Sequence, residues 1–457
     1  MSNSHFNTLC PLDGRYSGHL GNFAQVWSEL GLMKKRIQVE IEWLITITSH
    51  PEIFPGQGFQ PEQIQMLRRI GANFSAKDLK EIKKHEIRTE HDIKALEQFL
   101  RSQVLNICPD RKNLAECIHF GITSDDINNL SYALMLRQTR DESLLPNLKE
   151  IEHQLIRLAH RYSDCTMLGR THGQAAVPTT VGKEMANFAF RLQRQLKALK
   201  NQDFLAKFNG AVGNYSALYT GRPGIDWQSI TGKFINSFDL IENPYTTQIE
   251  PHDYVSEFFD NLARINTILL NLSRDIWLYM SQGYLSQQFG LEATGSSTMP
   301  HKSNPINFEN AEGNLGLANA LFNHFSSKLP CSRLQRDLSD STVMRNFGVG
   351  FGYALVAYRS LIQGLKVIVV QTETIREDLN RHYEVLGEAI QTVMRAQFST
   401  GAFDNLRSFS KGKILDRLKV HNFIKELNLS EDEKNRLLKL TPESYIGLAY
   451  LLAENIK

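Results

Sequence analysis

The sequence has little cysteine, and its cysteines form no recognisable site. Five occur among 457 residues, widely scattered. An odd number without any CxxC pair argues against a disulfide scaffold and a structural zinc site, and is typical of a reducing compartment. The HExxH motif of zinc hydrolases is also absent, so we expect no metal ion. The cysteines are Cys10, Cys108, Cys117, Cys165 and Cys331.

Several other signatures are missing. Neither GxGxxG nor GxxxxGK[ST] occurs, so neither a dinucleotide-binding fold nor a P-loop is indicated, and no GxSxG nucleophile elbow is present. We therefore expect no cofactor. No apolar run approaches the ~18 residues that a membrane-spanning helix needs.

The chain also lacks a strong charge of either sign. Its formal net charge is +2, which gives no general attraction to nucleic acid or to an anionic membrane. The first residues, MSNSHFNTLC, have neither the basic nor the apolar stretch of a signal peptide. We therefore expect a soluble cytoplasmic protein with neither nucleic acid nor membrane as a partner.

What the sequence does contain is strong helical periodicity. Apolar residues recur at steps of three and four in four long stretches, which places them along one face of each helix. Strand-like alternation is rare, so we predict an all-α fold built on long bundled helices, with any sheet being small. Such faces often exceed what one chain can cover, so we also expect oligomers, with dihedral symmetry for a tetramer. The stretches run from Leu144 to Leu158, Met185 to Leu199, Phe258 to Met280 and Leu355 to Val369.

The patterns divide the chain into three predicted domains. Residues 1–111 carry shorter helical patterns interrupted by prolines, residues 112–364 hold most of the long apolar faces, and residues 365–457 form a smaller helical unit. Local cap and turn chemistry adds further predictions. These are a capping box at Ser430 and Glu433, an N-cap with a first-turn proline at Thr441-Pro442, a helix start or kink at Pro146, and a long turn with four glycines at 209–224.

One polar segment, GSSTMPHKSNP at residues 295–305, stands between two helical patterns. It has no apolar periodicity, and it gathers hydroxyls, an imidazole, an amine and an amide between Gly295 and Pro305. Glycine and proline mark it as a loop, and loops held by rigid helices concentrate binding and catalysis. The alternative, a plain polar connector, does not need Met299 and Pro300 in the middle of a polar run. We predict a functional loop.

Two polar clusters lie before helical or proline-marked segments. Thr123-Ser124-Asp125-Asp126 is typical of a helix N-terminus, which either binds a carboxylate or is only an N-cap with acidic first-turn residues. In Arg170-Thr171-His172-Gly173-Gln174, a histidine sits in a non-periodic segment. Histidine is the natural proton donor near neutral pH, although a lone loop histidine is more often a surface residue.

Two further clusters carry charge. Gln248-Ile249-Glu250-Pro251-His252-Asp253 directly precedes the longest apolar face and is either a site or a capped helix start. Residues 332–345 hold three arginines and several hydroxyls, which could clamp a phosphate or carboxylate because guanidinium matches these anions bidentately. The alternative is a solvated helix face with internal ion pairs of little energetic value.

Together these segments resemble the fumarase/aspartase superfamily, whose signature GSSxMPxKxNP matches residues 295–305. Within it the chain resembles the adenylosuccinate lyase family of the bacterial long form. The resemblance implies an all-α, three-domain fold whose central helices form a 20-helix core in a homotetramer, with each site built from three subunits. The supporting segments are PLDGRY at 11–16, EHDIKA at 90–95, TSDDINN at 123–129, RTHGQ at 170–174, NPYTTQIEPHDY at 243–254 and the 331–346 segment.

The resemblance implies a β-elimination that breaks a C–N bond and releases fumarate. The substrates of this family are adenylosuccinate, which gives AMP, and SAICAR, which gives AICAR, in purine biosynthesis without metal or cofactor. A weakly acidic proton must leave a carbon next to a carboxylate, the resulting dianion needs positive charge and fixed donors, and the departing nitrogen needs a proton.

By this resemblance, two residues exchange the protons. Ser296 is the general base and His172 the general acid. Lys302 and Asn304 steady the aci-carboxylate, and Glu309 orients His172. A serine base requires a closed, dry site with oriented donors.

The other implied residues bind substrate. Thr123, Ser124 and Gln248 hold either the succinyl carboxylates or the base region of the substrate. Arg15 and Tyr16, with Arg336, Ser341 and Arg345, bind the phosphate, which argininosuccinate lyase, fumarase and aspartase do not need to do. The remaining implied residues are His91, which supports catalysis or grips the phosphate, and the substrate contacts Glu90, Asp92, Thr171, Ser297, Asn310 and Thr342.

Three alternatives stand beside this interpretation. Argininosuccinate lyase or another fumarate-releasing member is the nearest one. A catalytically silent structural protein on the same scaffold would be favoured by loss of Ser296 or His172, and both residues are present. A helical adaptor that binds partner helices would not need polar loops rich in histidine, serine and lysine.

Overall fold

The structure, a computed structural model, describes most of the chain. The described residues are 8–56, 58–109, 111–288, 299, 302–398, 401–410 and 415–457, without the side chains of Phe403 and Asn405. They divide into two compact units, each made of interleaved segments: residues 1–147, 196–266 and 314–356 in the first, and residues 148–195, 267–313 and 357–457 in the second. The predicted domains 1–111, 112–364 and 365–457 stay a prediction.

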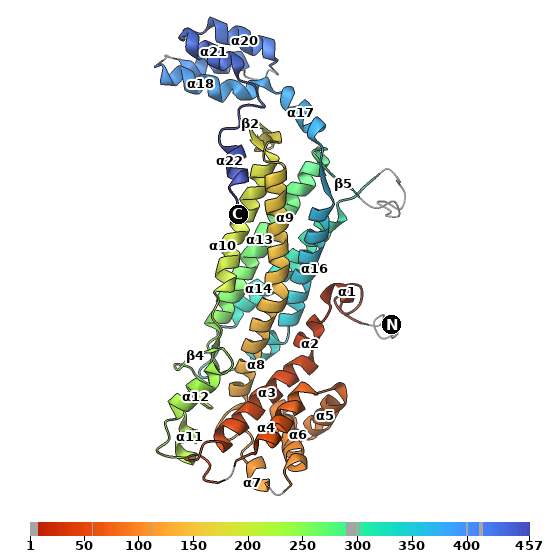
Figure 1. Cartoon of the computed structure of the whole chain (residues 1–457), viewed down its shortest axis with the longest axis vertical. Helices are drawn as coiled ribbons and strands as arrows, with labels where there is room; N and C mark the ends of the chain where they lie inside the picture. The colour runs from red at the N-terminus through yellow and green to blue at the C-terminus, as the bar shows by residue number, and fades with distance from the viewer. Residues whose placement is uncertain are drawn as a thin grey trace. The chain divides into compact units, whose positions relative to one another are not determined.

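Five long helices contribute residues to both units. Each carries a predicted apolar face or directly follows the signature segment, and Figure 1 shows their course. They are α9 (Leu145–Arg161), α10 (Val181–Lys200), α13 (Asp253–Ser281), α14 (Ile306–Lys328) and α16 (Phe347–Lys366).

The first unit begins with helices of the N-terminal segment. Helix α3 packs against α4 and α8, and α5 packs against α6. The other elements of this unit are α1 (Ser17–Leu20), α2 (Phe23–Trp27), α3 (Glu29–Thr48), α4 (Pro61–Ala72), α5 (Ala76–Thr89), α6 (Asp92–Ile107), α7 (Lys112–Ala115), α8 (Ser124–Thr139), the π-helix η2 (Arg140–Leu144), α11 (Ser216–Gly221), α12 (Trp227–Asn236), α15 (Ser339–Met344), and the parallel strands β3 (Leu205–Ala206) and β4 (Ile241–Glu242).

An aromatic cluster forms the core where α13, α14 and α16 meet in this unit. The ring of Phe259 stacks on Phe351 at 5.3 Å and lies 4.8 Å from Phe347. Phe322 and Phe325 of α14 lie 5.2 and 5.0 Å from Phe259. All five side chains are at most 1% exposed. Burying rings of this size supplies much of the stabilisation that fixes the three helices against one another.

The second unit adds two small sheets to its helical segments. Its shorter elements are the antiparallel pair β1 (Thr166–Thr171) and β2 (Gln174–Thr180), the antiparallel pair β5 (Leu285–Gln287) and β6 (Ile368–Val370), α17 (Thr372–Asn380), the 3₁₀-helix η3 (Tyr383–Leu386), α18 (Gly387–Ala396), α19 (Ala402–Ser410), α20 (Arg417–Glu426), α21 (Glu431–Lys439) and α22 (Ala449–Glu454).

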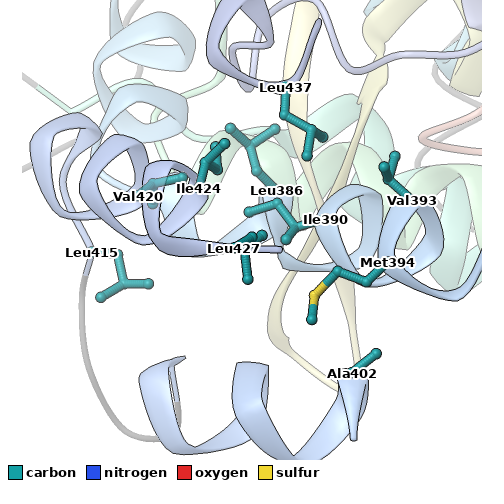
Figure 2. Packing of buried hydrophobic residues seen from close by; sticks show 10 residues of the cluster. All are labelled: Leu386, Ile390, Val393, Met394, Ala402, Leu415, Val420, Ile424, Leu427 and Leu437. Atoms are coloured by element: carbon teal, nitrogen blue, oxygen red, sulfur yellow. The ribbon is translucent and has the colours of Figure 1, made fainter. Parts of the chain in front are cut away.

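Helices α18 to α21 have a hydrophobic core of their own. Figure 2 shows Leu386, Ile390 and Val420 among the ten buried residues of this cluster. The stacked rings of Phe409 and Phe423, 4.2 Å apart, belong to the same subdomain. This core holds the C-terminal helices together.

The structure confirms the helical predictions. In the 258–280 stretch, the six seam residues from Phe258 to Ile276 are 0% exposed, and the residues of the 185–199 seam are at most 6% exposed. The described strands form only two-stranded sheets, as expected from the scarcity of alternating patterns. Periodicity near 3.5 therefore identified buried faces correctly.

Pro146 lies where the sequence placed a helix start or a kink. It is the second residue of α9 and follows the π-helix η2. Proline lacks an amide hydrogen and its ring clashes with the preceding turn, which is relieved where the helix changes its hydrogen-bonding pattern. The prediction is confirmed.

Two local predictions need correction. Thr441-Pro442 starts no helix: the Thr441 amide donates to Ser444 Oγ at 2.9 Å, the Ser444 amide donates back to Thr441 Oγ1 at 3.2 Å, and the next helix begins only at Ala449. The reciprocal side-chain bonds close a turn instead. The 209–224 stretch is not turn throughout, because it contains helix α11. Of the capping box predicted at Ser430 and Glu433, only the N-cap half is confirmed: the Ser430 hydroxyl accepts from the Glu433 amide at 3.3 Å, while the Glu433 carboxylate accepts from Arg436 at 2.8 Å.

Candidate active site

The predicted helix N-terminus at Thr123 is present. Thr123 is the N-cap of α8, and its amide donates to Asp126 Oδ2 at 2.8 Å as one half of a capping box. Thr123 and Ser124 are half-buried at this end. Unpaired amides and the positive end of the helix dipole favour an anion here.

A buried ion pair joins this N-terminus to a distant segment. Lys207 Nζ lies 2.7 Å from Asp126 Oδ1, and both side chains are 0% exposed. The ammonium also donates to the carbonyls of Gly210 and Gln248 at 2.8 and 2.9 Å. Asp126 accepts from the amides of Asn209 and Gly210. Because these partners compensate the cost of burying charge, the pair fixes the α8 terminus against residues 207–210.

The Gln248 side chain is held from both sides. Its Nε2 donates to the Ala211 carbonyl at 3.1 Å, and its Oε1 accepts from Arg336 Nη1 at 3.2 Å. Arg336 is 17% exposed and lies 3.7 Å from Asp340. Both Gln248 and Arg336 line a pocket of about 400 Å³. The structure therefore brings these two predicted substrate contacts together.

Two buried carboxyl groups near Arg336 differ in their acidity. Burial raises the pKa of Asp125 to about 6, although Lys207 and Arg336 oppose the shift. Burial also acts on Asp340, but His252, whose Nε2 lies 3.9 Å from Asp340 Oδ2, and the Arg336 charge hold the pKa of Asp340 below its usual value. Asp340 therefore balances the Arg336 guanidinium at neutral pH, while Asp125 takes up a proton near pH 6.

The raised pKa of Asp125 predicts a pH-dependent contribution to stability. The unfolded chain releases this proton near pH 3.8 and the folded chain near pH 6, so the stabilisation is present below pH 3.8 and is lost as the pH rises through 6. At pH 5, which lies one unit below the folded pKa, it is on the order of 1 kcal/mol. Asp125→Asn should thus be more favourable relative to wild type at pH 7.5 than at pH 5.0.

Melting temperatures at one protein concentration would measure this difference. The control is Asp432→Asn, which removes an exposed carboxylate of α21. A variant-minus-wild-type difference for Asp125→Asn that is the same at both pH values would contradict the prediction.

Asp92 connects two arginines. It lies 2.8 Å from Arg36 Nη1 and 3.3 Å from Arg345 Nη2. Burial opposes its ionisation, but the Arg36 charge lowers the pKa of Asp92 below its usual value. Arg36 is 4% exposed and Arg345 is 48% exposed. Asp92 therefore orients Arg345, whose exposed side chain can also meet an anion.

The two residues before Asp92 connect helices α5 and α6. Glu90 ends α5 in the left-handed conformation at φ 50°, where asparagine and glycine are favoured. His91 is the N-cap of α6, and its Nδ1 accepts from the Lys94 amide at 3.2 Å. This bond requires an unprotonated Nδ1, so a neutral His91 carries its hydrogen on Nε2. The exposed ring can then donate to a ligand.

The other predicted phosphate contacts lie in two places. The Ser341 amide donates to Asp340 Oδ1 at 2.6 Å, and the Ser341 carbonyl accepts from the Arg345 amide at 3.4 Å. Thr342 next to it is exposed. The alternative of a solvated helix face with internal ion pairs is met only in part: helix α15 spans only Ser339–Met344, but Arg333 pairs with Asp337 at 3.4 Å and Arg336 with Asp340 at 3.7 Å. Arg15 is exposed and makes no hydrogen bond or ion pair with the described residues.

His172 lies at the tip of the β1–β2 hairpin. Thr171 pairs with Gln174, so His172 and Gly173 form a two-residue turn, with φ of 53° and 72°. Two positive φ values define the type I′ turn, which matches the twist of the strands. The expected non-periodic segment is therefore a hairpin. Thr171 and His172 are exposed, and the imidazole has no hydrogen-bond partner among the described residues.

The residues after the signature serines lead into helix α14. Asn304 accepts from Gln287 Nε2 through its carbonyl at 3.2 Å, and Lys302 is exposed. Glu309 accepts from Trp277 Nε1 at 3.1 Å. Within the described chain no bond joins Glu309 to His172. Asn310 accepts from Ser360 Oγ at 2.9 Å. Ser296 and Ser297 lie outside the described residues.

The predicted residues therefore fall into separate groups. The first unit contains the phosphate and carboxylate contacts, in which Gln248 meets Arg336 and Asp92 meets Arg345. The second contains the hairpin with His172 and the end of the signature segment. The sequence analysis missed Lys207, although a lysine inside the apolar run Leu205–Phe208 is a recognisable sign of a buried cation.

The described residues include neither a candidate membrane span nor a candidate metal site. No helix in this part of the chain is long and apolar enough to cross a membrane. No group of three or more histidine, cysteine, aspartate or glutamate side chains in the described ranges is arranged to hold a metal ion.

Comparison with known proteins gives matches along the whole chain. The family described as "Lyase" matches residues 14–319, and that described as "Adenylosuccinate lyase C-terminal" matches residues 332–446. Adenylosuccinate lyase of Escherichia coli (strain K12) is 46% identical over 457 residues, with 100% of each chain covered. Adenylosuccinate lyase of Haemophilus influenzae is 47% identical over 456 residues, again with 100% of each covered. The chain belongs to the adenylosuccinate lyase family.

Solved structures of low sequence identity support the fold of this adenylosuccinate lyase family member. A fumarate lyase from Mesorhizobium sp. BNC1 superposes with a TM-score of 0.76 at 17% identity, covering 95% of this chain and 97% of that one. A 3-carboxy-cis,cis-muconate lactonizing enzyme from Pseudomonas putida gives 0.74 at 20% identity, with 94% of each covered. At such identities the likeness shows the all-α fold that the family shares.

Proposed function

We propose that this chain cleaves adenylosuccinate to AMP and fumarate, and SAICAR to AICAR and fumarate. The observation that carries the proposal is full-length similarity to adenylosuccinate lyases, combined with every residue type that the elimination requires. The reaction fits an enzyme without metal or cofactor, because side chains alone can move the two protons and stabilise the dianion. The cytoplasm, where purine synthesis takes place, is its proposed location.

His172 is the proposed general acid. Its exposed position on a hairpin tip allows the imidazole to reach a ligand, and the turn fixes where the backbone lies. Ser296 is the proposed base, with Lys302 and Asn304 stabilising the aci-carboxylate. This part rests on the match of residues 295–305 to the superfamily signature.

The arginines of the first unit are the proposed phosphate grip. Arg345 is oriented by Asp92, and Arg336 is held between Gln248 and Asp340. Oriented guanidinium groups suit a phosphate dianion, which they can bind through paired hydrogen bonds. This grip supports a nucleotide substrate over argininosuccinate, which has no phosphate.

The proposed assembly is a homotetramer with sites shared between subunits. Large apolar side chains remain exposed on the long helices of the single chain, among them Phe190 at 58%, Leu278 at 49% and Leu317 at 52%. These side chains are available for association through helix faces, as a symmetric oligomer requires. Within the described chain Glu309 accepts from Trp277 and has no bond to His172, so the proposed contact between Glu309 and His172 is assigned to two different subunits of the proposed tetramer.

An absorbance assay tests the proposed function. Purified protein in the presence of a metal chelator should cleave adenylosuccinate, which is seen as a loss of ultraviolet absorbance when the purine loses its succinyl group. SAICAR should be cleaved as well, and argininosuccinate should not. An enzyme that is inert toward both purine substrates but turns over argininosuccinate would overturn the proposal.

A further inference from the structure

The last turn of helix α17 reaches the hairpin that carries His172. Asp378 Oδ2 lies 2.7 Å from an Nη atom of Arg170, which stands two residues before His172 on strand β1. Leu379 of the same turn packs with Leu168 of β1 and Val385 of η3 in a small buried cluster. The hairpin is therefore attached to α17 by one ion pair and one apolar contact.

The same carboxylate oxygen also binds strand β5. The Tyr284 hydroxyl, immediately before β5, donates to Asp378 Oδ2. Burial, followed by the hydrogen bond to Asp378, raises the pKa of Tyr284 to about 12, so the hydroxyl stays a donor at neutral pH. Tyr284 is 2% exposed and stacks on Tyr279 with ring centroids 6.2 Å apart. Its position is thus fixed independently of the hairpin.

Strand β5 is itself joined to the start of α17. The Gln371 amide donates to the Tyr284 carbonyl at 2.9 Å, and the Gln371 side chain donates to Ser286 Oγ at 2.6 Å. Strands β5 and β6 pair directly before α17. Helix α17 is consequently anchored at its first turn to β5 and at its last turn to both β5 and the hairpin.

The Asp378 carboxylate also lies near the imidazole of His382. His382 Nε2 lies 3.6 Å from Asp378 Oδ1, while its Nδ1 lies 2.6 Å from Glu384 Oε1. Asp378 is 25% exposed, so the ion pair with Arg170 is only partly shielded from water. A single pair of this kind adds little to overall stability, but it can still fix a geometry when one partner is already held.

We propose that Asp378 is a positioning residue for the proposed general acid: by bridging Arg170 and Tyr284, it fixes the β1–β2 hairpin against β5 and sets the place of His172. The inference rests on the proposed function of His172. It assigns a catalytic consequence to helix α17, which lies about 200 residues farther along the chain than the hairpin. Neither His172 nor its turn makes a hydrogen bond of its own to α17 among the described residues.

The test replaces the carboxylate by its neutral isostere. Asp378→Asn should lower kcat for adenylosuccinate by about 10- to 100-fold, because a misplacement of about 1 Å can cost 10²-fold, while KM changes little. Asp378→Glu, which keeps the charge, should recover part of the loss. The matched control is Glu377→Gln on the same helix, which should leave kcat unchanged, because the exposed Glu377 carboxylate pairs with Arg381 at 3.9 Å and not with the hairpin among the described residues.

A double-variant cycle separates positioning from general damage to the fold. Arg170→Met removes the same ion pair from the hairpin side, so the double variant should lose less activity than the product of the two single losses. Hydrogen exchange of the hairpin amides at residues 170–175 should increase in Asp378→Asn and stay unchanged in Glu377→Gln. This measurement does not depend on catalysis.

The outcomes distinguish this inference from the proposed function. If wild-type protein is inert toward both purine substrates, the proposed function fails, and unchanged exchange in the hairpin would then also reject the positioning contact. If wild type is active, an Asp378→Asn variant with kcat within twofold of wild type overturns the inference alone. Independent losses for Arg170→Met and Asp378→Asn would overturn it as well.

Discussion

Replacing His172 by alanine should lower kcat by about 10²- to 10⁴-fold, the range typical of a positioned general acid. The leaving nitrogen of adenylosuccinate needs a proton as the C–N bond breaks, and without a donor it would depart as an anion. Binding should be affected far less, because the imidazole is needed mainly in the transition state. Initial rates over a range of adenylosuccinate concentrations would separate kcat from KM.

His172 has a left-handed backbone conformation, so a second variant that tolerates this conformation is needed beside His172→Ala. Alanine at φ 53° strains the backbone, so a loss in His172→Ala alone mixes lost chemistry with a distorted turn. His172→Asn tolerates this conformation and removes the imidazole, so it should show a loss of similar size. His153→Ala, an exposed histidine of α9, serves as the control. A turnover within tenfold of wild type in His172→Asn would reject the imidazole as the acid.

The features that the sequence predicted correctly are those determined by residues close together in the chain. The buried seams of the long helices follow from spacing alone, as the 0% exposure of Phe258 and Leu262 shows. The N-cap at Thr123 and the position of Pro146 also follow from local chemistry. The helix start predicted at Thr441-Pro442 is wrong, because a threonine hydroxyl can close a turn as readily as it can cap a helix.

Contacts between distant segments could not be predicted. The Asp126–Lys207 ion pair joins residues about 80 positions apart, and the Arg170–Asp378 pair joins residues 208 positions apart. The sequence around each residue does not indicate which distant residue will pair with it, because the packing of the helices determines the pairing. The hairpin at His172 is different: a His-Gly pair that forms a two-residue turn was visible in the sequence, but the strands around it have no clear alternation.

The functional assignments depended on the family more than on geometry. A serine base has no local sequence pattern that distinguishes it from an ordinary loop serine, because its basicity would come from donors around it in the closed site. Composition alone indicated anion binding by the arginines of residues 332–345 as one of two alternatives, beside a solvated helix face. The structure adds the carboxylates that orient them, Asp340 and Asp92.

The central claim is that the imidazole of one subunit and the signature serine of another act on one substrate. Mixing His172→Ala with Ser296→Ala protein tests it, since each variant alone should be nearly inactive. After dissociation and reassembly of a 1:1 mixture, about one site in four receives both intact residues if they come from different subunits of a symmetric oligomer.

The measurement is adenylosuccinate turnover of the reassembled mixture, compared with each variant treated in the same way. We predict recovery to about one quarter of wild-type kcat per site, the fraction expected from random exchange of subunits. Mass spectrometry of isotope-labelled subunits would establish that exchange had occurred. If the subunits exchange and the mixture stays as inactive as its components, the two residues do not meet across subunits, and the proposed site is wrong.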